Sequence, residues 1–394
     1  MEKTNNNPLH TLVRSEDLVK VALGQSPADL VIRGGQLVDV FGGEIRQADI
    51  AIKGERIAIV GDAGHSTGGA TQVIDAAGMY LTPGLIDTHV HIEASMVSPT
   101  QFARAVLPRG NTTILWETLW TGNVLGKQGI RFFLEELNRT PLKVFAAVAS
   151  GVPSITSRLA TPGHEFNLQD LDELLEMEQA ATLGEVVYLA EVLDGDPHIH
   201  NAMRLALSKK KQVDGSGAGF NAAQLAAYAA SGVRADHEAV NVEEAVNRIR
   251  NGMWLVIREG SGFCNLEETI KAITERKLSP RRVCFCVDDK DISDVVRSGG
   301  IDYMVREAIR AGVDPVTAVQ MASLNAAEYL HLDTHIGGIA PGMFADILLV
   351  KDLGDFRPHQ VIVNGKVTAV DGKLCTEIKN PAYPPEISLS LIHI

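Results

Sequence analysis

Two histidines, His89 and His91, end an apolar run at residues 80–91 (YLTPGLIDTHVH). Side chains alternate between faces along a β-strand, so both imidazoles point the same way, roughly 7 Å apart along the strand. Imidazole is a common ligand of divalent transition metals. An incidental pair on a solvated strand is the alternative. The apolar strand, together with acidic residues and a further histidine downstream, favours a metal centre.

Three more candidate ligands stand at the ends of other apolar segments, namely Glu191, His237 and Asp288. Each has a structural alternative. Glu191 can instead cap a helix or form an ion pair, and His237 can be a buried core histidine. Either Asp288 or its neighbour Asp289 can cap the next helix. We predict that Glu191, His237 and Asp288 bind metal and that Asp289 caps the next helix.

These residues need a scaffold that brings the ends of distant strands together. Strand-like and helix-like segments alternate through the middle of the chain, which predicts an α/β protein with a (β/α)8 barrel. Active sites of such barrels lie at the C-terminal ends of the strands, where the candidate ligands fall. The predicted strands are 81–91, 112–117, 143–152, 186–193, 211–215, 234–237, 253–259 and 282–288, and the predicted helices include 99–108, 126–137, 168–181, 222–231 and 242–251.

Short β-rich runs punctuated by glycine precede this region, after a predicted helix at 10–25, and similar runs return near the end. One small β-sandwich domain built from both chain ends explains this pattern. We therefore predict the helix and first sandwich part in 1–80, the barrel in 81–336, the sandwich return in 337–379, and a tail in 380–394.

Composition excludes several functional classes. The 394 residues carry a net charge of −13, which disfavours nucleic-acid binding. The first residues have no apolar signal core, and no apolar stretch approaches a membrane span. Of four cysteines, Cys284 and Cys286 share a strand face without redox-motif spacing, so we expect buried free thiols. A cytoplasmic protein is expected.

Several separated blocks carry a family resemblance. Residues 83–93 (PGLIDTHVHIE) resemble the first-strand signature of the amidohydrolase superfamily. Blocks at 95–108, 123–126, 235–238, 258–261, 287–289 and 300–303 are similar to bacterial adenine deaminases, and residues 338–346 (GIAPGMFAD) resemble that family's return into its sandwich. The resemblance covers roughly residues 28–370.

The resemblance implies metal-dependent hydrolytic deamination of adenine to hypoxanthine and ammonia. It implies a divalent ion, with Mn favoured over Fe or Zn, a purine or related heterocycle as substrate, and a homo-oligomer. The implied ligands are His89, His91, Glu191 (bridging), His237 and Asp288, with Asp288 and Glu191 catalytic. Substrate contacts are predicted for Glu117, Arg258 and Glu259, although Arg258 and Glu259 have the alternative of pairing only with each other.

Two positions depart from the family pattern. Ser216 stands where the family has a metal-ligand histidine, and Leu119 where it has a histidine thought to assist catalysis. A hydroxyl is a poor ligand for a transition ion, so we expect one tightly held ion, with a second weak or absent. His198 and His200 have the alternative of compensating for these losses, but we expect them in a solvated loop. The alternatives are an amidohydrolase acting on another heterocycle or cyclic amide, and a catalytically weak barrel used for binding or assembly.

The final residues 389–394 (LSLIHI) match one reading frame of a sequencing-library adapter. Adenine deaminases of this type also continue into a further C-terminal domain. We therefore expect a truncated gene fragment with an artefactual end, in which His393 is not a ligand.

Overall fold

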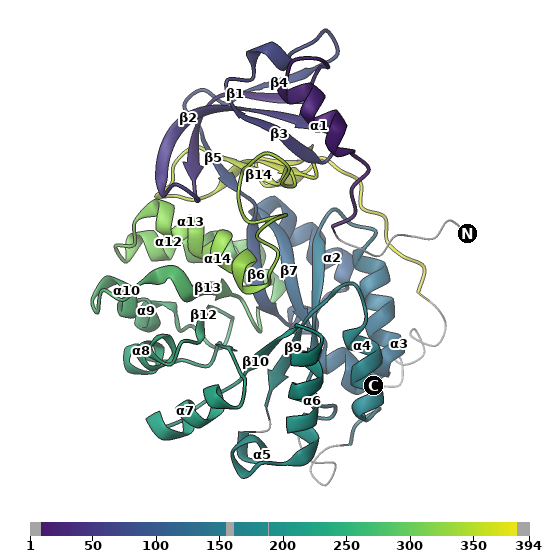
Figure 1. Cartoon of the computed structure of the whole chain (residues 1–394), viewed down its shortest axis with the longest axis vertical. Helices are drawn as coiled ribbons and strands as arrows, with labels where there is room; N and C mark the ends of the chain where they lie inside the picture. Colours follow the sequence, from purple (N-terminus) through teal and green to yellow (C-terminus); the bar gives the residue numbers. More distant parts are fainter. Residues whose placement is uncertain (1–8, 155–160, 188, 384–394) are drawn as a thin grey trace.

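Two sheets organise the molecule, and Figure 1 shows them one above the other. The computed structural model describes residues 9–154, 161–187 and 189–383. Eight strands form a nearly closed parallel barrel, and nine strands form a separate mixed sheet. The predicted α/β barrel with an additional β domain is confirmed. Most of the predicted tail, including His393, lies outside the described residues.

The barrel strands follow one another around the ring in chain order. They are β6 (Leu85–Val90), β7 (Asn111–Glu117), β8 (Lys143–Ala149), β9 (Ala180–Val186), β10 (Gln212–Gly215), β11 (Ala235–Asp236), β12 (Trp254–Arg258) and β13 (Val283–Cys286). The last strand returns to the first, because the Asp288 amide donates to the His89 carbonyl at 3.0 Å and the His91 amide donates to the Asp288 carbonyl at 3.3 Å. This closure places the paired histidines beside Asp288.

Helices surround the barrel strands (Figure 1). Many begin at an asparagine or aspartate that accepts backbone N–H groups; Asn167 and Asn221 each form a complete capping box. The helices are α2 (Pro99–Val106), α3 (Leu119–Leu137), α4 (Leu168–Leu175), α5 (Leu189–Asp194), α6 (Pro197–Ser208), α7 (Ala222–Ala230), α8 (Val242–Arg250), α9 (Leu266–Thr269), α10 (Lys271–Thr274), α11 (Ile292–Ser298), α12 (Ile301–Arg310), α13 (Pro315–Ala322) and α14 (Leu324–Tyr329). Within the described residues, no helix has the length and apolar character to cross a membrane.

The predicted fourth strand is wrong. The prediction places it over 186–193, but β9 occupies Ala180–Val186, which begins at the last two residues of the predicted helix 168–181. The prediction missed β9 because Gly184 lies within it. This strand approaches β8 so closely that a Cβ atom on Gly184 would lie 2.6 Å from the Ala147 Cβ. Glycine permits this approach but weakens the sequence signal of a strand.

The predicted first strand, 81–91, is two strands. Gly84 separates β5 (Tyr80–Pro83), which belongs to the mixed sheet, from β6 of the barrel. The chain therefore crosses between the two sheets at this glycine, where a Cβ atom would lie 2.2 Å from the Thr112 Oγ1.

Both chain ends build the mixed sheet, in the order β17-β16-β15-β14-β5-β1-β2-β3, with β4 paired to β1. Its strands are β1 (Leu30–Asp39), β2 (Glu44–Lys53), β3 (Arg56–Gly61), β4 (Gln72–Asp75), β5, β14 (Ile347–Val350), β15 (Pro358–Val363), β16 (Lys366–Val370) and β17 (Lys373–Leu374). The two ends meet where β5 pairs antiparallel with β14, with Leu81 opposite Leu349. Helix α1 (Ser15–Ala22), shorter than the predicted 10–25, lies beside β3.

The barrel strands β6, β7, β8 and β13 are buried along their whole length, and the core includes the predicted thiols. Cys284 and Cys286 lie on β13, and both are buried and free, as expected. They pack with Ile86, Leu115 and other side chains in the barrel interior.

Candidate metal centre

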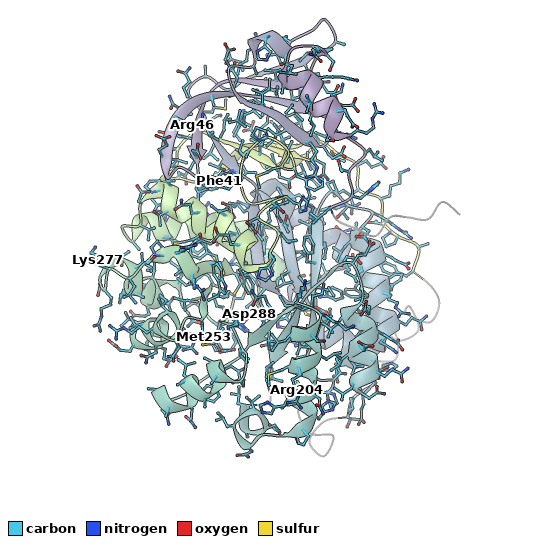
Figure 2. The ribbon with its side chains drawn as sticks, in the orientation of Figure 1. Phe41, Arg46, Arg204, Met253, Lys277 and Asp288 are labelled. Carbon is cyan, nitrogen blue, oxygen red and sulfur yellow. The ribbon has the colours of Figure 1, made fainter. Side chains whose placement is uncertain are left out.

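Five buried ligand-type side chains converge at the C-terminal ends of barrel strands. They are His89 in β6, His91 directly after β6, Glu185 in β9, His237 after β11 and Asp288 after β13. Asp288 is labelled in Figure 2. Parallel strands present their carboxyl ends at one rim, which explains how residues nearly 200 positions apart meet.

One group of ligand atoms surrounds the two histidines of β6. The Nε2 atoms of His89 and His91 lie 3.3 Å apart. The Asp288 Oδ1 lies 3.5 Å from each of them, and the Glu185 Oε2 lies 3.6 Å from the His91 Nε2. Two imidazoles and two carboxylates thus face a common point.

A second group shares Glu185 with the first. The His237 Nε2 lies 3.4 Å from the Glu185 Oε1 and 3.6 Å from the Glu238 Oε1. The His237 ring also stacks on His89, with ring centroids 4.1 Å apart. Glu185 therefore directs one oxygen to each group, which is the geometry of a bridging carboxylate.

These spacings suit a divalent metal ion. Two ligand atoms bound at about 2.1 Å to one ion, at right or tetrahedral angles, lie roughly 3.0–3.4 Å apart. The observed separations of 3.3–3.6 Å are close to that range. The buried His237 Nε2 has no hydrogen-bond partner among the described residues, although two carboxylates face it. The residues present therefore fit the metal that the family resemblance implies.

The ionisable side chains of the centre shift one another's pKa values. Burial opposes ionisation of Glu185 and Asp288, but the surrounding histidines outweigh it and hold the pKa of both carboxyls below their usual range. For His237, burial is likewise outweighed by Glu185 and Asp288, which raise its pKa to about 9. Burial lowers the pKa of His89 to about 3, so this imidazole is neutral and available as a ligand.

Asp288 adopts an unusual backbone conformation. Its φ of +53° lies in the left-handed region, which aspartate tolerates better than most residues. In this conformation the Oδ1 faces the histidines while the Oδ2 accepts a hydrogen bond from the Arg258 Nη1 at 3.0 Å. The sequence predicted a helix-capping role for Asp289, and this is wrong, because Asp291 caps α11. Asp289 lies near His91 and Asp288 instead.

The predicted bridging role of Glu191 is not compatible with its position. Glu191 lies in the first turn of α5, outside the groups of ligand atoms, because β9 ends five residues before it. Glu185 is the site residue that the sequence reasoning missed. The sequence signal for Glu185 is weak. Glu185 follows the uncharged segment 179–184, whose alanines and glycine do not indicate a strand.

The three predicted substrate contacts lie in different places. Glu117 is fully buried at the end of β7, with its Oε2 3.9 Å from the His91 Nδ1; burial and then the Glu185 charge raise its pKa well above the usual value. Arg258 is buried between Glu238 and Asp288. Glu259 accepts a hydrogen bond from the Leu266 amide at 3.1 Å, so exclusive pairing of Arg258 with Glu259 is wrong.

The positions that depart from the family pattern lie beside the centre. Ser216 follows β10 directly, and its Oγ lies 3.5 Å from the Glu238 Oε1. Leu119 is buried, and its amide donates to Glu117. His198 and His200 lie on α6 rather than in the predicted loop, and neither joins the groups of ligand atoms.

Comparison with known proteins agrees with this geometry. The model of the Amidohydrolase family matches residues 80–368. Adenine deaminase of Moorella thermoacetica is 41% identical over 98% of this chain and 64% of that protein, and adenine deaminase of Rubrobacter xylanophilus is 42% identical over 97% and 64%. The chain thus spans slightly less than two thirds of the length of these relatives.

Solved structures share the fold at low sequence identity. A beta-aspartyl dipeptidase from Fervidobacterium islandicum has a TM-score of 0.66 and 17% identity, covering 90% of this chain and 99% of that one. A D-hydantoinase from a Bacillus species has a TM-score of 0.62 and 14% identity, covering 88% and 96%.

Proposed function

The chain belongs to the amidohydrolase family, and from this premise and the geometry of its centre we propose that it deaminates adenine hydrolytically to hypoxanthine and ammonia. The observation that carries the proposal is Glu185, whose two oxygens face two adjoining groups of buried ligand atoms. The relatives named adenine deaminase, about two fifths identical over nearly the whole chain, support adenine as the substrate.

The residues that would hold the metal are His89, His91, Glu185, His237 and Asp288. When bound, a divalent ion supplies Lewis acidity and lowers the pKa of water towards neutrality. Imidazole and carboxylate ligands accept Mn, Fe or Zn, and we propose Mn from the family resemblance. Glu185 replaces Glu191 in the bridging role that the sequence predicted.

Asp288 is proposed as the residue that moves protons. Its pKa is held low, so the carboxylate is ionised and can accept a proton from the attacking water. The water oxygen bonds to the ring carbon that carries the amino group, and the carbon–nitrogen bond breaks. One water proton leaves with the amino group as ammonia, and the other stays on a ring nitrogen of hypoxanthine. Glu185 is the second candidate for this role because its Oε2 lies 3.6 Å from the His91 Nε2, nearly as close as the Asp288 Oδ1 at 3.5 Å.

Arg258 and Glu117 are proposed to act through other residues. Arg258 is almost completely enclosed, and its Nη1 holds the Asp288 Oδ2, so it positions the proposed base. Glu117 has no solvent exposure and adjoins His91, so it supports that ligand. The contacts of Glu259 offer no support for its predicted binding role. The predicted homo-oligomer and cytoplasmic location stay predictions.

The decisive experiment combines metal analysis with a substrate panel. Purified protein loaded with Mn²⁺ is expected to release ammonia from adenine faster than from guanine or cytosine. Opening of a hydantoin without ammonia release from adenine would replace adenine by a cyclic amide, the first alternative that Ser216 and Leu119 suggest. Bound metal with no turnover on any compound would favour a binding role instead.

A further inference from the structure

The second group of ligand atoms contains a carboxylate that the ligand set implied by the family resemblance does not include. We propose that Glu238 completes a second cation subsite together with Glu185 and His237, in the place where Ser216 offers no imidazole. The inference rests on the metal centre of the proposed function and is independent of the substrate.

The geometry places Glu238 within reach of a shared ion. Ligand atoms of Glu185, His237 and Glu238 all lie within 4.8 Å of one another. The separation of 3.6 Å between the Glu238 Oε1 and the His237 Nε2 resembles the separations within the first group. Glu238 follows His237 directly after β11, so the same strand end delivers both side chains. Its amide donates to the Asp236 Oδ1 at 3.0 Å, which fixes the backbone at this point.

Ser216 acts on this subsite through Glu238. Its backbone amide donates to the Tyr228 hydroxyl at 3.2 Å, and that hydroxyl donates to the Val186 carbonyl at the end of β9. This arrangement holds the serine beside the centre, with its Oγ 3.5 Å from the Glu238 Oε1. The short serine side chain leaves the position beside His237 to the longer glutamate, whose oxygen is a better ligand for a divalent ion.

Arg258 holds Glu238 and also limits the affinity of the subsite. Its Nη1 and Nη2 donate to the two Glu238 oxygens at 2.9 and 3.0 Å, a bidentate pair that orients the carboxylate. The same guanidinium also donates to the Asp288 Oδ2 at 3.0 Å, so its positive charge lies beside both groups of ligand atoms. A first divalent ion adds to this positive charge, so the second ion binds more weakly than the first.

The test is a titration of metal-free protein with Mn²⁺, in which electron paramagnetic resonance measures the free ion. The unmodified protein is expected to bind one ion tightly and a second more weakly. Glu238→Gln is expected to weaken the second step by about 10-fold or more while the first stays nearly unchanged. The matched control is Glu243→Gln. This variant removes an exposed carboxylate of α8 that pairs with Arg276, and it should leave both binding steps unchanged.

A second variant separates loss of the subsite from a disturbed fold. Adding Ser216→His to Glu238→Gln should restore the second step, because an imidazole then adjoins His237, and thermal unfolding of each metal-free variant checks the fold. The proposal is overturned if the unmodified protein binds a single ion, or if Glu238→Gln binds two ions as tightly as the unmodified protein. Ammonia release from adenine is not measured, so this result and the test of the proposed function stand apart.

Discussion

At the scale of single residues, the environment of Asp288 decides what its carboxyl group can do. A left-handed backbone divides its two oxygens between the histidines and Arg258. The same aspartate thereby faces the proposed ligand set and stays ionised, as a proton acceptor in this centre requires.

We predict that Asp288→Asn lowers kcat for ammonia release by about 10²–10⁴-fold. The amide keeps an oxygen that can face the histidines, so metal content should change little, but it cannot accept the proton of water. Elemental analysis and an ammonia assay on the same preparation check both parts. Turnover near that of the unmodified protein would transfer the proton-accepting role to Glu185 or Asp289.

A second residue-scale prediction concerns Asp214, which is buried on β10 and accepts a hydrogen bond from the Tyr329 hydroxyl. Burial raises its pKa from 3.8 to about 6. The folded state therefore holds this proton more tightly than the unfolded state, so the contribution of Asp214 to stability falls as pH rises from about 4 to 6 and is constant above that.

Asp214→Asn removes this titration. The unfolding free energy of the unmodified protein relative to the variant should fall by roughly 3 kcal/mol between pH 4 and pH 7, because one pKa unit corresponds to about 1.4 kcal/mol. Urea unfolding of both metal-free proteins across this range measures the difference. A pH-independent difference would mean that Asp214 is not titrating in this window.

At the scale of elements, the register of β9 decides which glutamate enters the centre. Thr182 and Leu183 of β9 pair with Ala147 and Val148 of β8, and Gly184 permits the close approach of the two strands. Glu185 then falls at the rim among the histidines, while Glu191 falls on the following helix.

Two matched substitutions test this register. Glu185→Gln should reduce bound metal, because it removes the charge shared by both groups of ligand atoms, whereas Glu191→Gln should bind as much metal as the unmodified protein. Elemental analysis after removal of loosely held ions measures both. Metal loss in the Glu191 variant alone would restore the assignment made from the sequence.

At the scale of the whole molecule, a buried ion pair joins the barrel to the mixed sheet. The Nζ of Lys143, the first residue of β8, donates to both oxygens of Asp346 at 2.9 and 2.7 Å and also to Asn364. The Phe344 ring adjoins both this ammonium and the Arg56 guanidinium, which lie 4.4 and 3.6 Å from the ring centroid. These contacts tie the amino end of the barrel to the sheet, at the end of the strands away from the metal centre.

We predict that Lys143→Met destabilises the protein by about 3–5 kcal/mol, because it leaves the Asp346 charge buried without its partner. The double variant Lys143→Met/Asp346→Leu should lose much less. Arg357→Met, which breaks an exposed pair with Asp355, serves as the control and should cost about 1 kcal/mol or less. Urea unfolding measures all three, and a small effect of Lys143→Met alone would contradict the structural role of the pair.

The sequence by itself determined the features that depend on near neighbours. The alternation of strands and helices indicated the barrel, and the spacing of His89 and His91 placed both on one strand face, because these patterns repeat within a few residues. The positions of His237 and Asp288 after apolar strands were also readable, since the C-terminal rim of a parallel barrel follows from topology.

Only the tertiary structure decided which side chains meet across strands. The choice of Glu185 over Glu191 depends on how closely β9 approaches β8, and the pairing of Arg258 with Glu238 rather than Glu259 depends on which face of the β12 end turns inward. The proximity of Ser216 to Glu238 likewise joins the ends of two strands. Such contacts are set by packing between residues far apart in the chain, which leaves no local pattern from which they can be read.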